Sequence, residues 1–430
     1  MNSGSPPAPR RVTRSAWIAL ALLVLALLAA IALRTVMQPQ HATRLILDQV
    51  GRALGLQLTA SGTAEYSLRG TPTLTIRNVI AREPGARTAL LRADRIHLAL
   101  PWSTIRQLAN GPSDAVVIIN RVELDRPIVD VEAMQHWLAH RPPSKAPLPT
   151  LTEGMLISDG TILGTGWSLK GLAVDIPMLA ATQPFKASTS GRYVSSGLQV
   201  PFEVHVALSR PANDARIGVA GQVTIERDTW RMPSQIVLSG DLHTSGDWRL
   251  HRAKLAAASS YDSGKTHAPF TMGIAGELHS DNARLALDPA GVVVHGKGAI
   301  PDLVARGTVA VSSTLDLRLD GAMPAWPAGW PDLPAPVGTS QSPLAFGIRY
   351  AGKPDLSDAI ALQLHRDATQ FEGRLQLSRF STWIGAAASG SPIPPLVGRV
   401  TAPQLDIAGA TLQGVTIDID DADTQPAAAP

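Results

Sequence analysis

The sequence contains no cysteine. This absence excludes disulfide bonds, thiolate metal sites and cysteine nucleophiles, and it is compatible with export to a bacterial periplasm. Aromatic residues make up only 4% of the 430 residues, and charged residues make up 17%, against about 25% in a typical soluble domain. The chain is therefore rich in aliphatic side chains but poor in the large rings that usually dominate a packed core. Its 36 glycines and 34 prolines predict frequent turns.

Long apolar segments are also scarce, because only residues 16–33 form one. At about 1.5 Å per residue, this uncharged run nearly crosses a hydrocarbon core of roughly 30 Å. Arg10, Arg11 and Arg14 precede it, which predicts a cytoplasmic N-terminus. We therefore predict a single membrane anchor, with everything after Arg34 on the far side of the membrane. The anchor residues are Trp17, Leu22, Leu25 and Leu28.

A cleaved signal peptide is the alternative interpretation of this run. Such a peptide has a shorter apolar core that ends at a small-x-small site, for which Ala30-Ile31-Ala32 is a weak candidate. The apolar stretch continues through that site to Leu33, so we favour an uncleaved anchor. Either interpretation exports the remainder of the chain.

The charge balance argues against a nucleic-acid partner. Without the three arginines that precede the anchor, the 38 Lys and Arg residues fall to 35, which equals the number of Asp and Glu residues. The exported part is formally neutral, so the high pI of the whole chain is no sign of a basic binding surface.

Short periodic segments follow the anchor. A helix is predicted over 43–54, after which apolar and polar residues alternate over 56–59, 74–77 and 96–100, as in half-buried strands. Further helices are predicted over 103–110 and 131–140, and two strands over 116–119 and 122–131. The proline-rich segment 141–149 then predicts a domain boundary. The expected organisation is a cytoplasmic stub and anchor (1–38), a β-rich domain with short helices (39–149), a long antiparallel sheet (150–421) and a disordered tail (422–430).

Beyond the linker, helical periodicity nearly vanishes and alternating runs recur, which predicts a long, curled antiparallel sheet with one apolar face. The runs are 219–225, 236–242, 274–278, 309–319, 344–350, 360–364, 371–377, 405–407 and 415–419. Because little helix is predicted to cover this face, we expect an open apolar groove, with a closed sandwich or barrel as the alternative. The candidate lining residues are Leu315, Leu317, Leu319, Leu375, Leu377, Val415, Ile417 and Ile419.

A second proline-rich segment, residues 323–343, interrupts the alternating runs and contains Trp326 and Trp330. Proline cannot donate a ladder hydrogen bond, so this segment is not a central strand. We interpret it as a loop that caps the sheet. A loop that contacts a partner or a membrane is the alternative.

The sequence offers no convincing catalytic or metal site. His136 and His140 are four residues apart on a predicted helix, but the sequence supplies no third ligand, so we favour solvated histidines. The residues Gly264-Lys265-Thr266 have no leading glycine at Ser259 and no following helix, which indicates a turn. The acidic residues from Asp418 to Asp423 are better explained as the solvated face of a strand, and the Gly-x-Ser-x-Gly motif is missing. We expect neither an enzyme nor a cofactor.

Several segments together resemble the AsmA-like family of Gram-negative inner-membrane proteins. They begin with Leu54-Gly55-Leu56-Gln57-Leu58 after the anchor and end with the segment 395–415. Between these lie 73–79, 91–100, 122–131 with Trp137 after it, and 154–162. Each segment is a degenerate strand pattern, so the resemblance depends on their order and on the anchor.

The resemblance implies an inner-membrane tether that carries a periplasmic sheet curled into a groove, with phospholipid as the partner and no catalytic residues. It further implies a role in outer-membrane assembly or envelope lipid homeostasis. An aliphatic groove would bind acyl chains, with a gain of roughly 0.8 kcal/mol for each CH₂ group leaving water. The alternative function is an envelope scaffold or assembly factor that docks an inner- or outer-membrane protein by strand addition.

Overall fold

The computed structural model describes most of the chain beyond the predicted anchor. The described residues are 55–61, 65–109, 116–140, 148–245, 247–264, 266–281, 284–330, 332–379, 395–407 and 409–420. The predicted anchor with Trp17, Leu22, Leu25 and Leu28, the helix predicted over 43–54, most of the 141–149 linker and the predicted tail lie outside them. Within the described residues, no helix has the length and apolar character needed to cross a membrane.

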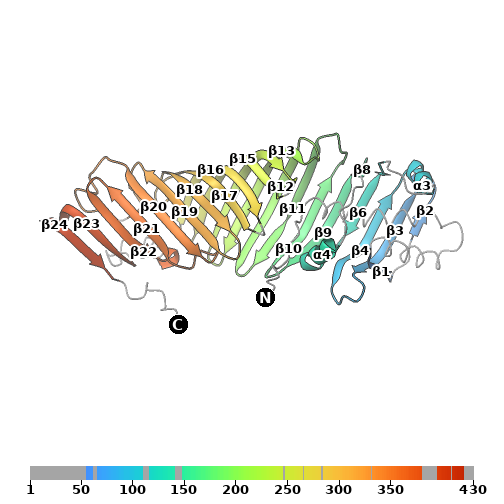
Figure 1. The fold of residues 1–430 in the computed structure, drawn as a ribbon, viewed down its shortest axis with the longest axis horizontal. Coiled ribbons are helices and arrows are strands. Elements are labelled where there is room, and N and C mark those ends of the chain that lie inside the picture. The colour runs from blue at the N-terminus through green and yellow to red at the C-terminus, as the bar shows by residue number, and fades with distance from the viewer. Residues whose placement is uncertain are drawn as a thin grey trace, which may run out of the picture. The chain divides into compact units, whose positions relative to one another are not determined.

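Strands dominate the described residues, and 22 of them are assigned to one sheet, with β5 and β8 in a second (Figure 1). This confirms the prediction of a mainly β chain with a long, largely antiparallel sheet and few helices. The chain divides into two compact units, which we describe separately: unit 1 comprises residues 1–231 and 242–248, and unit 2 comprises 232–241 and 249–430. Strand β14 (Trp230–His243) contains residues of both units.

Among its described residues, unit 1 contains thirteen complete strands and two helices. The strands are β1 (Gln57–Ala60), β2 (Glu65–Ser67), β3 (Thr73–Arg82), β4 (Ala89–Ala99), β5 (Ile118–Ile119), β6 (Arg121–Asp125), β7 (Ile128–Asp130), β8 (Thr150–Leu151), β9 (Met155–Gly164), β10 (Trp167–Ile176), β11 (Phe185–Ser195), β12 (Leu198–Leu208) and β13 (Asp214–Arg227). The helices are α3 (Trp102–Ala109) and α4 (Val131–Ala139). Most elements predicted over 56–140 are therefore present, but the strand predicted over 122–131 is divided into β6 and β7.

A closed hydrophobic core lies in the N-terminal part of unit 1. It is built mainly by β3 and β4, whose side chains Ile76, Ile96 and Leu98 are almost fully buried. Helix α4 adds Trp137, which is 2% exposed. The helix begins at an N-cap, because the Asp130 carboxylate accepts a hydrogen bond of 2.9 Å from the backbone N–H of Ala133.

The sheet of unit 1 does not end at the predicted domain boundary. Strand β9 follows the linker and pairs in parallel with both β6 and β7, and β5 pairs in parallel with β8. Residues 150–164 thus extend the N-terminal sheet, and an antiparallel description is incomplete there. From β9 to β13, successive strands pair antiparallel.

A charged network lies between β4 and β6. Glu123 accepts hydrogen bonds from Arg121 at 2.6 Å and from Arg95 at 2.9 Å, and Arg95 also binds Asp125 at 2.6 Å. The Arg121 hydrogen bond, supported by Arg95, outweighs the desolvation of the carboxyl group and lowers the pKa of Glu123 below its ordinary value of 4.5.

This shift predicts an acid-sensitive contribution to the stability of unit 1. Because folding lowers the pKa of Glu123, its carboxylate stabilises the fold above pH 4.5, and this contribution is lost as the pH falls through the lower, folded pKa. Pulsed deuterium labelling of β4 in urea, at pH values from 7 to 3, measures the effect. Glu123→Gln should be less stable than the wild type at pH 7 and should approach it at low pH. A constant difference across this range would contradict the prediction.

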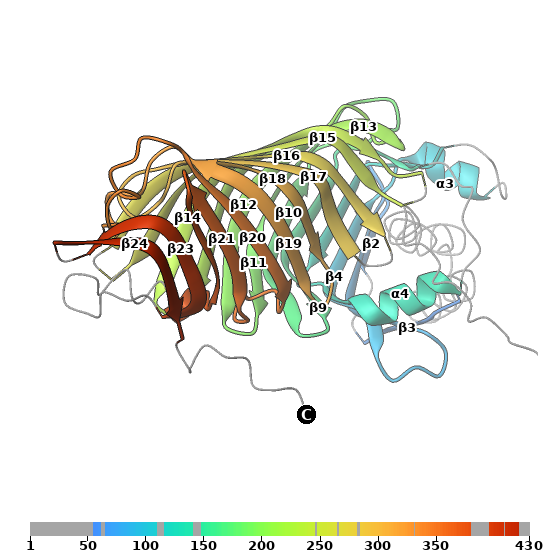
Figure 2. The same cartoon turned by 60° about the vertical axis from the view of Figure 1, so that its left-hand side comes forward.

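The part of unit 2 that the structure describes contains ten complete strands in an antiparallel meander. They are β15 (Arg249–Ser263), β16 (Thr266–Asp281), β17 (Arg284–Gly296), β18 (Leu303–Val311), β19 (Leu315–Met323), β20 (Leu344–Gly352), β21 (Ile360–Arg366), β22 (Thr369–Leu375), β23 (Leu396–Ile407) and β24 (Ala410–Ile419). Each strand pairs with the next along the chain. Figure 2 shows that β23 and β24 bend along their length.

One predicted run in unit 2 is divided in two. The apolar residues of 309–319 keep the same odd-numbered phase on both sides of three polar residues, 312–314. The structure places a turn at these polar residues, between β18 and β19, where the Ser312 N–H donates to the carbonyl of Thr314. Gly264, expected in a turn, lies between β15 and β16 with φ +56°.

Candidate functional site

The register of unit 2 aligns small and aliphatic residues into rows that cross all ten strands on one face. We call two of these rows the first and second apolar rows. The first apolar row is Leu255, Ile274, Val292, Ala305, Gly321, Phe346, Leu364, Phe371, Val400 and Ile417. The second is Ala253, Gly276, Ala290, Gly307, Leu319, Ile348, Leu362, Gly373, Gly398 and Ile419. Neither row contains a charged or hydrogen-bonding side chain.

Aromatic rings lie close to three of the five glycines of these rows. A Cβ atom built on Gly373 would lie 2.6 Å from the Phe371 ring, and one built on Gly398 would lie 2.9 Å from the same ring. Phe346 covers Gly321 in the same way, at 2.6 Å. Because these glycines have no Cβ atom, the rings can approach the backbone closely.

Side chains of the apolar rows differ in burial from the core of unit 1. The larger ones, such as Leu255, Leu319, Leu362 and Ile417, are half-buried, whereas core residues such as Ile96 are almost inaccessible. Among the described residues of unit 2, buried side chains form two small clusters, one around Met323, Leu344 and Phe346 and another around Ala402, Leu405 and Val415. Neighbouring strands thus shield these side chains laterally, while much of their outward surface remains accessible.

The structure places most of the predicted lining residues on this face. Leu319 and Ile419 belong to the second apolar row and Ile417 to the first, so segments more than 90 residues apart in the sequence share one surface. Leu317 pairs with Val309 and Tyr350, next to the second row, and Leu375 is buried against Leu396 and Ile360. The remaining residues on the face are Leu315 and Val415.

Leu377 is a correction to the predicted lining. The strand β22 ends at Leu375, two residues before Leu377, and the Leu377 side chain is 42% exposed. The alternating pattern runs on through Leu377, but the sheet does not.

The tryptophan loop packs on the apolar face rather than standing away from it. Trp326 is half-buried against the cluster of Met323, Leu344 and Phe346. Its ring meets that of Trp330 edge to face, with centroids 4.9 Å apart, and the Trp330 Nε1–H donates to the Ala299 carbonyl at 2.8 Å. This arrangement supports the interpretation of the loop as a cap over β18–β20.

The far end of the same loop is fixed by a buried arginine. The Arg366 guanidinium donates from Nε to the Ser342 carbonyl at 2.7 Å and from Nη1 to the Val337 carbonyl at 3.0 Å. Hydrogen bonds from Ser340 and Ser342 lower the pKa of the neighbouring Asp367. The loop is therefore held by β21 at one end and packs on apolar side chains at the other.

Apart from the buried Arg366, which binds the loop, the ion pairs formed by β19, β20, β23 and β24 lie on the opposite face. Arg349 donates to both carboxylate oxygens of Asp320 at 2.7 and 2.9 Å, and Arg399 donates to Asp418 at 2.6 Å, which raises the pKa of Arg399. Asp418, expected on the solvated face of a strand, is exposed there. Alternation along these four strands thus separates an aliphatic face from an ion-paired one.

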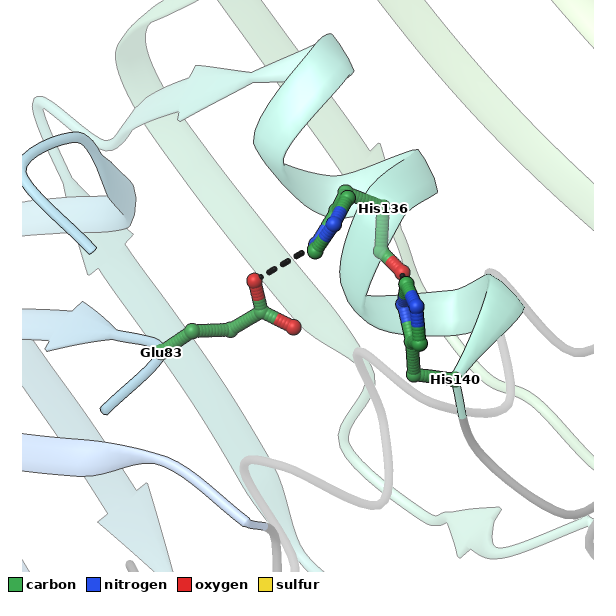
Figure 3. A group of neighbouring side chains, drawn as sticks. All are labelled: Glu83, His136 and His140. Carbon is green, nitrogen blue, oxygen red and sulfur yellow. Dashed lines mark hydrogen bonds and ion pairs between the residues drawn. The ribbon is translucent and has the colours of Figure 1, made fainter. Parts of the chain in front are cut away.

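Two polar features lie in unit 1. A hollow of about 710 Å³ over β10–β13 is lined by Lys170, Arg192, Glu203 and other mainly polar side chains. Elsewhere, the structure supplies a third polar partner to the two histidines of α4. Glu83, in the turn after β3, lies 2.7 Å from the Nδ1 atom of His136 (Figure 3). Sequence reasoning missed Glu83, because it is 53 residues from His136 and no local pattern connects them.

Unit 2 thus defines a mainly β protein with a two-sided sheet, aliphatic on one face and charged on the other. Comparison of the chain with family models, with curated proteins and with solved structures finds no match. The resemblance to the AsmA-like family therefore depends on the sequence patterns alone.

Proposed function

We propose that this chain is a non-enzymatic phospholipid-binding protein, tethered to the bacterial inner membrane, that helps to transfer lipid in outer-membrane assembly or envelope lipid homeostasis. The supporting observation is the pair of apolar rows that cross ten strands of unit 2, in which the larger aliphatic side chains are half-buried. The predicted anchor and the AsmA-like sequence order support the location and the family.

The dimensions of the face suit hydrocarbon chains. Ten strands at about 4.8 Å spacing give rows on the order of 40 Å long. An acyl chain spans about half of a 30 Å hydrocarbon core, or roughly 15 Å. A bound chain would therefore contact several strands, and the rows have length for more than one lipid.

The energetics suit a carrier better than a storage protein. A lipid tail that leaves water gains roughly 0.8 kcal/mol for each CH₂ group it buries. A tail that leaves a membrane exchanges one aliphatic environment for another, so its net gain is small. Binding and release at membranes would then be nearly balanced, while escape into water would remain strongly unfavourable.

The separation of faces predicts weak headgroup selection. Residues of the two rows carry no charge, and the Asp320–Arg349 and Arg399–Asp418 pairs lie on the other face. The protein would therefore recognise tails and leave the headgroup in water. We place the Trp326–Trp330 loop as a cap over the tails, since Trp326 packs on the same aliphatic cluster.

Photocrosslinking in intact cells tests this proposal, with each probe matched to a neighbour on the opposite face. A benzophenone amino acid at Leu317, Leu375 or Ile417 is expected to capture phospholipid, identified by mass spectrometry of the purified adduct. The matched controls Arg318, Arg374 and Asp418 are exposed and should capture at least tenfold less lipid. Equal capture by both sets, or none by the first set, would contradict a lipid-binding face.

A further inference from the structure

We propose that Glu83, His136 and His140 form a binding site for one divalent ion of the zinc class. His136 lies in the last turn of α4 and His140 is its C-cap residue, and their ring centroids are 4.4 Å apart. Glu83 approaches from the turn after β3, and Figure 3 shows its carboxylate directed toward His136. One ligand atom from each of the three residues lies within 4.8 Å of the other two.

The donor set suits this class of ion. Two imidazoles and one carboxylate are the protein ligands of many open zinc sites, in which water completes the coordination. The His140 Nδ1–H donates to the carbonyl oxygen of His136 at 2.7 Å, which leaves the lone pair on Nε2. Such second hydrogen bonds fix the tautomer and orientation of metal-binding histidines.

The side chains need only a modest adjustment to close around an ion. Ligands at about 2.1 Å in tetrahedral geometry lie roughly 3.4 Å apart, somewhat closer than the present limit of 4.8 Å. The His136 side chain is 64% exposed and can rotate, and the Glu83–His136 hydrogen bond would be exchanged for coordination. The site thus resembles an open site with room for water more than a closed structural one.

The elements on both sides of the site are held by the core of unit 1. Helix α4 is fixed by Trp137, between the two histidines, and by the Asp130 cap at its N-terminus. Glu83 directly follows β3, whose residues Val79 and Ala81 are buried in the same core. A bound ion would therefore connect the helix to the β3–β4 turn, independently of any lipid on unit 2.

Metal titration of the full-length, untagged protein tests the site. Zn²⁺ in competition with a chromogenic chelator is expected to show one equivalent bound above background, and Co²⁺ is expected to give a visible absorption band typical of nitrogen and oxygen ligands. Glu83→Gln, His136→Gln and His140→Gln should each weaken Zn²⁺ binding at least tenfold. The control is His267→Gln, because His267 pairs with Asp262 at 2.7 Å in a similar exposed contact and should leave binding unchanged.

Hydrogen exchange supplies a second readout that needs no variant. Zn²⁺ should slow exchange in α4 and in the turn that contains Glu83, and should leave the strands of unit 2 unaffected. The proposal is overturned if no equivalent binds, if all three replacements retain wild-type affinity, or if His267→Gln weakens binding equally. Slowed exchange throughout the chain would also overturn it, since it would indicate unspecific binding.

Discussion

Replacing Leu362 by aspartate is expected to reduce the lipid recovered with the protein at least tenfold. Leu362 lies near the middle of the second apolar row, where it pairs with Ile348 on one side and Gly373 on the other. A carboxylate there would keep its charge only by holding water, and that water would displace the tails. Burying an unpaired charge costs several kcal/mol, and every 1.4 kcal/mol corresponds to a factor of ten in binding.

The matched control is the same replacement one residue further along the strand. Gln363 points to the charged face, where it donates to Glu372 at 3.3 Å, so Gln363→Asp should retain bound lipid. Lipid is measured by mass spectrometry after extraction from equal amounts of protein, and hydrogen exchange in β21 verifies that both variants fold. Equal loss in the two variants would show that the effect does not depend on the apolar face, and undiminished lipid in Leu362→Asp would show that the tails lie elsewhere.

The face of the sheet on which a side chain lies was easier to predict from the sequence than the pairing and the ends of the strands. Residues two apart in a strand share a face whatever the strand pairs with, so the Leu315–Leu317–Leu319 pattern is sufficient to place these side chains together. It does not reveal strand ends: Leu377 continues the pattern of β22 although the strand ends at Leu375, and the 309–319 run conceals a turn at Ser312. The apolar positions on the two sides of such a point can keep the same phase, so the pattern alone does not show that the strand has ended.

For a related reason, the long-range contacts of unit 1 could not be predicted from the sequence. The proline-rich linker is a local signal of a boundary, whereas the parallel pairing of β9 with β6 and β7 depends on chain segments on both sides of it. The contact between Glu83 and His136 is long-range in the same sense. The histidines of α4 were readable from their spacing of four, but their carboxylate partner is fixed only when β3 and α4 pack on one core.

Truncating one aliphatic side chain in each unit is expected to give very different losses of stability. Ile96→Ala in the core of unit 1 should cost about 3 kcal/mol, because Ile96 is 1% exposed and its removal leaves a cavity. Leu362→Ala should cost less than about 1.5 kcal/mol, because a half-buried side chain on an accessible face leaves no enclosed space. Hydrogen exchange measures both losses locally, in β4 and in β21, without requiring a single unfolding transition for the whole chain.

A second isoleucine in unit 1 separates the effect of burial from that of residue type. Ile128 is 39% exposed, so Ile128→Ala should change exchange in unit 1 by less than a factor of ten, whereas Ile96→Ala should accelerate it about a hundredfold. If Leu362→Ala proved as costly as Ile96→Ala, the apolar rows would be filled by tightly packed protein side chains, as in a closed sandwich. No room would then remain for tails. A small loss of stability in Leu362→Ala, together with loss of lipid in Leu362→Asp, would instead identify a face that is covered by bound lipid and not by the chain itself.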